Sequence, residues 1–193
     1  MTSQKDGKPA STGVRWLAGI CIIALIVGLR LFALNSDAYT RLDWSAALTP
    51  LAEAQSLVAI GRGPTLAIAR EAALKLKETC ALHAEAFSSA EVRHGPMELI
   101  DRDYPLLVFA PRGPEQAGLI QLARDMRARG ARVLLAAPDD VAEADLPLAT
   151  TGHPALDPIA AILTFYVMAA GLAAARGRNP DAPRHLNKVT ETH

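Results

Sequence analysis

Residues 61–98 read GRGPTLAIAREAALKLKETCALHAEAFSSAEVRHGPME, and this stretch decides the fold. It begins with a glycine turn directly after the apolar run SLVAI of residues 56–60. It continues as a helix from about residue 64 to residue 82 and ends in a His-Gly-Pro corner. A short apolar strand followed by a tight turn and a helix is the first half of a βαβ unit. The remaining sequence is therefore expected to add strands and helices to this unit.

The same alternation continues further along the chain. It predicts strands at residues 106–110, 132–137 and 146–149, and helices at residues 115–129 and 157–175. Strands rich in Val, Leu and Ile that alternate with helices pair in parallel through right-handed crossovers. The predicted fold of residues 43–193 is thus an α/β domain with a three-layer, doubly wound parallel sheet. Ligands of such sheets bind beyond the carboxyl ends of the strands, where the turns at 61–63 and 111–114 are expected.

The N-terminal residues do not fit this pattern. Residues 1–15 are polar and basic and predict a disordered arm. Residues 16–34 read WLAGICIIALIVGLRLFAL, an apolar helix of about the length that one membrane crossing requires. Residues 35–42 are polar and predict a linker. The alternative to a transmembrane segment is a foreign or truncated leader that does not belong to the design of the domain.

Composition excludes several classes of function. The 20 basic and 20 acidic residues balance, and aromatic residues make up only 5% of the 193, so nucleic-acid binding is not expected. The two cysteines, Cys21 and Cys80, form no CxxC pair, which excludes a disulfide framework and a cysteine zinc site. His83 and Glu85 match the HxE half of a zinc deaminase signature, but the PCxxC half is absent and no metal site is predicted.

Three places in residues 61–98 could carry chemistry. The turn Gly61-Arg62-Gly63 presents backbone N–H groups at a helix N-terminus, which favours an anion, although glycines also serve simply to make a tight turn. Glu78 lies near the C-terminal end of the helix, where the dipole disfavours a carboxylate. Ser88 and Glu91 form a capping box for a short helix that fixes His94 at its end. The alternative interpretations are a solvated glutamate and a histidine that complements a helix C-terminus.

These motifs carry a family resemblance. ALKLKE ending at Glu78, HAEA at residues 83–86 and HGP at residues 94–96 resemble the sugar isomerase (SIS) domain family. More narrowly, they are similar to the second SIS module of glutamine–fructose-6-phosphate aminotransferase and to related glucosamine-6-phosphate deaminases and phosphosugar isomerases. The tail NPDAPRHLNKVTET of residues 179–192 resembles that group as well, with LNKVTET closer to the deaminases.

The resemblance implies roles for individual residues. Glu78 corresponds to the glutamate that shuttles a proton between C1 and C2 of the sugar, His94 to the histidine that assists ring opening, and Lys188 to a tail lysine that closes over the substrate. Arg184 is expected to help fix that tail. Together with the anion-favouring turn Gly61-Arg62-Gly63, it completes the expected substrate-binding residues. Such chemistry needs a base that returns its proton and a cation near the enolate oxygen, and it requires neither cofactor nor metal. We therefore expect Glu78 and His94 to converge at one rim of the sheet.

The sequence departs from the family pattern in the turns that bind the phosphate group of the sugar. Enzymes of this group hold it with Ser/Thr-rich turns of the SxSGET type in a first SIS module, and these are absent here. The sequence therefore predicts a half-enzyme acting on a sugar phosphate, as a homodimer or with a partner SIS module. The alternative is a non-catalytic carbohydrate-binding or dimerisation module, tethered to a membrane by residues 16–34. The metabolites favour the cytoplasm, whereas a membrane anchor would place the domain outside it.

Overall fold

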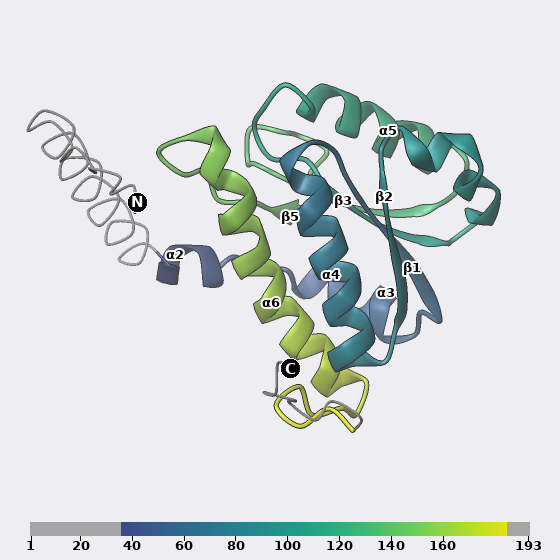
Figure 1. Ribbon diagram of the computed structural model, residues 1–193, viewed down its shortest axis with the longest axis vertical. Helices are drawn as coiled ribbons and strands as arrows, with labels where there is room; N and C mark the ends of the chain where they lie inside the picture. The colour runs from purple at the N-terminus through teal and green to yellow at the C-terminus, as the bar shows by residue number, and fades with distance from the viewer. Residues whose placement is uncertain (1–35, 185–193) are drawn as a thin grey trace, which may run out of the picture. The chain divides into compact units, whose positions relative to one another are not determined.

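The computed structural model describes residues 36–184. The basic arm, the apolar helix of residues 16–34 and Lys188 lie outside these residues and stay predictions (Figure 1). The expected linker of residues 35–42 contains a short helix, α2 (Ser36–Thr40). The Tyr39 carbonyl accepts a hydrogen bond of 2.6 Å from the Thr164 hydroxyl, so the end of this helix is held to the domain.

A parallel sheet of five strands forms the centre of the domain. The strands are β1 (Ser56–Gly61), β2 (His83–Ser88), β3 (Pro105–Phe109), β4 (Arg132–Ala137) and β5 (Leu146–Pro147). Their order in the sheet is β2-β1-β3-β4-β5, and every neighbouring pair is parallel. This confirms the predicted parallel sheet, and the strand order reverses between β1 and β3, which is where doubly wound folds place ligands.

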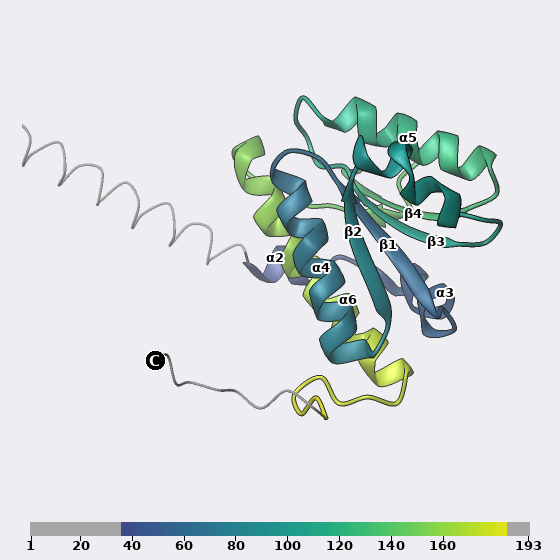
Figure 2. The same cartoon turned by 45° about the vertical axis from the view of Figure 1, so that its right-hand side comes forward.

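Helices cover both faces of the sheet, as the alternation of side chains along β1 requires. Leu57 and Ala59 pack with α3 (Leu48–Ala52), α4 (Pro64–Cys80) and α6 (Asp157–Ala175), whereas Val58 and Ile60 pack with α5 (Gln116–Ala128). Figures 1 and 2 show α4 and α6 on one side of the strands and α5 on the other. Buried strands are apolar on both faces because helices shield both. The three-layer arrangement is therefore the one predicted.

Strand β2 is absent from the prediction, which places no strand between the helix ending at about residue 82 and the capping box at Ser88 and Glu91. The structure pairs His83 and Glu85 with Ser56 and Val58 of β1. Since β2 is the edge strand, His83 and Glu85 are exposed while Ala84 between them is buried. A strand that alternates in this way has no apolar run, so the sequence pattern of a buried strand does not find it.

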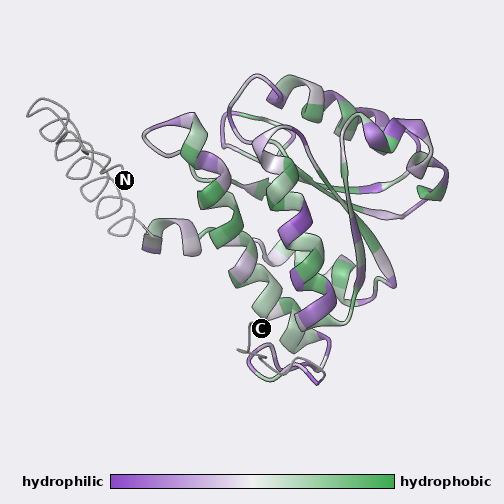
Figure 3. Ribbon diagram, in the orientation of Figure 1, coloured by the Kyte–Doolittle hydropathy of each residue, from purple (hydrophilic) through white to green (hydrophobic). Residues whose placement is uncertain are grey.

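Helix α6 is apolar on its outer face as well as its inner one (Figure 3). Ile159 and Val167 are 46% and 47% exposed. Burial and a hydrogen bond to Glu71 of α4 raise the pKa of Tyr166 to about 12, so its hydroxyl remains a donor between the two helices. Within the described residues, one span, Pro154–Ala175, has the length and mean hydropathy (1.9) of a membrane helix, but half of it is buried in the domain, as in an ordinary core helix.

Candidate functional site

The carboxyl edge of the sheet carries a cleft of 240 Å³ at the reversal of strand order between β1 and β3. Its charged lining consists of Arg62 from the turn after β1, Arg112 from the turn after β3, and Glu115. Five prolines also line it: Pro64, Pro111, Pro114, Pro154 and Pro158. The cleft is thus rigid and formed from three separate segments of the chain.

The turn at residues 61–63 satisfies its own backbone groups. The Arg62 N–H donates to Thr65 Oγ1 at 2.9 Å, and the Thr65 hydroxyl donates to the Arg62 carbonyl at 2.8 Å. A Cβ on Gly61 would lie 2.2 Å from the Thr65 carbonyl oxygen, which no side chain can tolerate. Packing alone therefore accounts for Gly61, and the Arg62 side chain is the exposed group left for a ligand.

Asp157 holds the wall of this cleft together. Its carboxylate is 1% exposed and accepts hydrogen bonds from Arg112 at 2.8 and 3.0 Å. It also accepts from the N–H and hydroxyl of Thr151, both at 2.7 Å. Burial by itself would raise the pKa of Asp157, but these donors outweigh it and leave the pKa below its usual value. The turn after β3 is thereby fixed to the start of α6.

The lowered pKa predicts how this carboxylate contributes to stability. A carboxyl whose pKa is lower in the folded state stabilises above its unfolded pKa of about 4 and loses that contribution as pH falls through the folded pKa. We expect Asp157→Asn to lower the free energy of unfolding by about 2 kcal/mol at pH 7 and by clearly less at pH 3. Urea unfolding at both pH values measures this, with the exposed Asp101→Asn as the control. If Asp157→Asn lowers the free energy of unfolding equally at both pH values, the ionised Asp157 carboxylate is not what stabilises the fold.

His94 also lies at the carboxyl edge. It ends the 3₁₀ helix Glu91–His94, which the predicted capping box begins: the Ser88 N–H donates to Glu91 Oε2 at 2.8 Å, and the Glu91 N–H donates to Ser88 Oγ at 3.1 Å. Its side chain is exposed. Gly95 then turns the chain with a φ of 144°. The imidazole is therefore presented to solvent from a well-defined helix end.

Glu78 lies at the other edge of the sheet, and the expected convergence with His94 in one chain is wrong. Helix α4 returns the chain to the amino edge, where β2 begins at His83, and His94 follows the carboxyl end of β2. The six residues of this strand separate the two positions by roughly 20 Å. The predicted residues thus divide into two groups: Gly61, Arg62, Gly63 and His94 at one edge, and Glu78 and Arg184 at the other.

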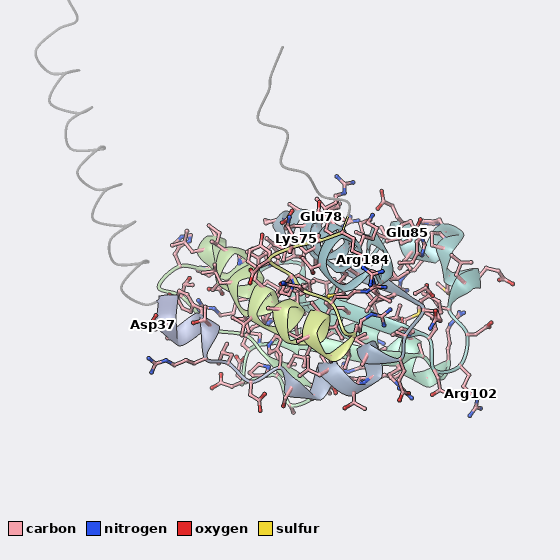
Figure 4. All side chains as sticks on the ribbon, turned by 90° about the horizontal axis from the view of Figure 1, so that it is seen from below. Asp37, Lys75, Glu78, Glu85, Arg102 and Arg184 are labelled. Atoms are coloured by element: carbon pink, nitrogen blue, oxygen red, sulfur yellow. The ribbon has the colours of Figure 1, made fainter. Side chains whose placement is uncertain are left out.

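Glu78 and Arg184 line a pocket of 710 Å³ at the amino edge. The end of α4 contributes Lys77, Glu78, Thr79 and Ala81, and the segment after α6 contributes Gly177, Arg178, Asn179, Ala182, Pro183 and Arg184. Figure 4 shows Glu78 and Arg184 grouped with Lys75 at this end of the domain. Lys188, the third member expected here, lies outside the described residues.

Lys75 holds the Glu78 carboxylate, a role that sequence reasoning missed. Its Nζ atom donates to Glu78 Oε2 at 2.7 Å and lies 3.8 Å from Glu71 Oε1. The hydrogen bond to Glu78 raises the pKa of Lys75, so the ammonium is retained. The i,i+3 spacing of Lys75 and Glu78 was the available signal for the closer pair.

Arg176, the residue that ends α6, supports the floor of the Glu78 pocket. Its guanidinium donates to five backbone carbonyls, those of Leu51, Ala52, Ala54, Cys80 and Ala81. The last two belong to the end of α4, where Ala81 adopts a left-handed φ of 50°. One side chain therefore joins the ends of α3, α4 and α6 and satisfies carbonyls that helix ends leave without partners.

Lysine cannot reproduce these contacts, because it lacks the planar fork of donors that arginine has. We expect Arg176→Lys to lower the free energy of unfolding by about 2 kcal/mol, and the melting temperature by about 6 °C. Thermal and urea denaturation followed by circular dichroism measure both. Arg129→Lys is the matched control, because Arg129 also ends a helix, α5, but is exposed and makes no such side-chain contacts among the described residues. Equal effects of the two substitutions would contradict the role of Arg176.

Comparison with known proteins supports the fold. Residues 50–144 match the family described as SIS domain. Glutamine–fructose-6-phosphate aminotransferase [isomerizing] of Zymomonas mobilis is 38% identical over 146 residues, which cover 72% of this chain and 24% of that protein. The chain therefore spans about a quarter of the length of such relatives.

Two solved structures extend the similarity to the backbone. A candidate phosphosugar isomerase of Silicibacter pomeroyi aligns with a TM-score of 0.67 and 40% identity, over 75% of this chain and 44% of that one. Glucosamine-6-phosphate deaminase of Thermotoga maritima aligns with a TM-score of 0.58 and 25% identity, over 83% and 46%.

Proposed function

We propose, from the SIS domain that this chain contains, that it is the base-bearing module of an enzyme that isomerises or deaminates an amino-sugar phosphate. The observation that carries the proposal is the pocket around Glu78, in which a carboxylate held by Lys75 faces the segment that contains Arg184. The names of the relatives support the substrate class, since they refer to fructose 6-phosphate and glucosamine 6-phosphate.

The groups in the pocket suit proton transfer at a carbon next to a carbonyl. Glu78 would take the proton from C1 or C2 and return it to the other carbon, as aldose–ketose interconversion requires. Lys75 would hold the carboxylate in one orientation while the sugar binds. The tail lysine expected to close over the substrate, Lys188, would supply the cation near the enolate oxygen that develops in the transition state.

The separation of Glu78 from His94 has a consequence for assembly. A site that uses both groups has to take them from two chains or from two modules. The exposed apolar face of α6, with Ile159 and Val167, supports association with a second copy or a partner SIS module. The SxSGET-type turns are not present in this sequence, so phosphate binding is left to another module or to other side chains of this one.

Solvent-deuterium incorporation tests the proposal. The chain is incubated in D₂O with fructose 6-phosphate or glucosamine 6-phosphate, alone and together with a separately purified first SIS module, and deuterium at C1 and C2 is followed by NMR. We expect exchange in the mixture that exceeds the sum of the two components. Thermal stabilisation of the chain by the sugar phosphate without any exchange would instead identify a non-catalytic binding module.

A further inference from the structure

We propose that Lys77, Arg178 and Arg184 form an anion site that binds the phosphate group of the sugar within this chain. The inference rests on the proposed function for the identity of the sugar. It concerns a different step, however, because binding of the phosphate precedes proton transfer and can be measured without it.

The charge of the pocket is the first argument. Three cationic side chains and one carboxylate line it, and the carboxylate, Glu78, already has Lys75 as a partner at 2.7 Å. Among the described residues, Lys77, Arg178 and Arg184 have no ion pair and no side-chain hydrogen bond, although seven other cation–carboxylate pairs are formed in the same part of the chain. Within residues 36–184, the pocket therefore has an excess of positive charge that no carboxylate pairs with.

The helix ends beside the pocket would normally oppose an anion. Both α4 and α6 end there, and helix C-termini carry partial negative charge. Arg176 removes part of this field, because its guanidinium donates to the carbonyls of Cys80 and Ala81 at the end of α4. The cations of the pocket thus remain available for a ligand.

The arrangement fits a phosphate monoester. Lys77 comes from α4 and the two arginines from the segment after α6, so an anion between them would be held from two sides. A phosphate carries nearly two negative charges at neutral pH and accepts several charge-assisted hydrogen bonds at once. The volume of 710 Å³ lies within the range of small-molecule sites, which leaves room for a six-carbon sugar beside Glu78.

Equilibrium binding tests this site with the full chain. Isothermal titration calorimetry with fructose 6-phosphate, fructose and inorganic phosphate compares the unmodified chain with Lys77→Gln, Arg178→Gln, Arg184→Gln and the triple variant. Each single change is expected to weaken fructose 6-phosphate binding about threefold to tenfold, and the triple change more than about thirtyfold. Fructose should bind far more weakly than its phosphate, inorganic phosphate should compete, and affinity should fall with added salt.

Arg102→Gln is the matched control, because Arg102 is exposed and lies well apart from Glu78 and Arg184 (Figure 4). Its affinity should equal that of the unmodified chain. Binding that survives the triple change, equal binding of fructose and fructose 6-phosphate, or no binding by the unmodified chain would each overturn the anion site. Phosphate binding that depends on the three cations but is never followed by deuterium exchange would retain the anion site and reject the enzymatic function. Deuterium exchange that persists in the triple variant, with fructose 6-phosphate bound as tightly as by the unmodified chain, would reject the anion site and retain the enzymatic function.

Discussion

Replacing Glu78 with glutamine is expected to lower the rate of deuterium incorporation about 10³-fold in the assay that combines this chain with a first SIS module. Glutamine keeps the shape of the side chain and can still contact Lys75, but it cannot accept a proton at neutral pH. The fold should persist, because the Glu78 side chain is 21% exposed and lines a solvent-accessible pocket. Circular dichroism and the melting temperature verify this independently of the exchange rate.

Glu71→Gln is the control for that experiment. Glu71 lies on the same helix and its Oε1 atom is 3.8 Å from Lys75 Nζ, but it does not line the Glu78 pocket. The same chemical change at residue 71 should alter the exchange rate less than about threefold. If Glu78→Gln exchanges at the rate of the unmodified protein, or if both substitutions lower it equally, Glu78 is not the base.

The scaffold was predictable because its main elements repeat one pattern. Strands β1, β3 and β4 are continuous apolar runs, and α5 and α6 follow them with clear ends, so periodicity and turn residues located them closely. The same reasoning located the capping box at Ser88 and Glu91, whose two reciprocal hydrogen bonds are present. These features depend on residues near one another in sequence, which is where sequence patterns are most informative.

The error at the site has one physical origin, the missed strand β2. Only sixteen positions separate Glu78 from His94, and with a loop between them the two side chains could have met at one rim. Because residues 83–88 form a strand that runs from the amino edge to the carboxyl edge of the sheet, the two groups lie at opposite edges instead. An edge strand buries one face and exposes the other, so HAEAFS carries polar residues at positions where a central strand would be apolar.

The cationic pocket was beyond sequence reasoning for a related reason. Lys77 and Arg178 are 101 positions apart, and they line one pocket only because α6 packs along α4 and ends beside it. Arg176 fixes this meeting of helix ends through carbonyls of α3 and α4, an interaction that no motif encodes. Tertiary packing, and not local spacing, therefore decides which charges share the pocket with Glu78.

The second large effect is expected at Gly61, where the conformation of the backbone leaves no room for a side chain. A Cβ at this position would lie 2.2 Å from the carbonyl oxygen of Thr65, 2.4 Å from its carbonyl carbon and 2.7 Å from the amide nitrogen of Leu66. All three atoms belong to the backbone at the start of α4, so no side-chain rotation can relieve the overlap. Gly61→Ala should therefore lower the free energy of unfolding by about 3 kcal/mol, measured by urea denaturation.

Gly118→Ala, in contrast, is expected to stabilise the fold. Gly118 lies in α5, and a Cβ there would meet nothing within 4 Å. Alanine is the better helix former, so this substitution should raise the free energy of unfolding by about 0.5 kcal/mol. Comparable stability of the two variants would contradict the close approach of β1 to α4. Because α4 carries Lys75 and Glu78 at its far end, a shift of its first turn should also displace the pocket, and Gly61→Ala should then weaken fructose 6-phosphate binding while Gly118→Ala leaves it unchanged.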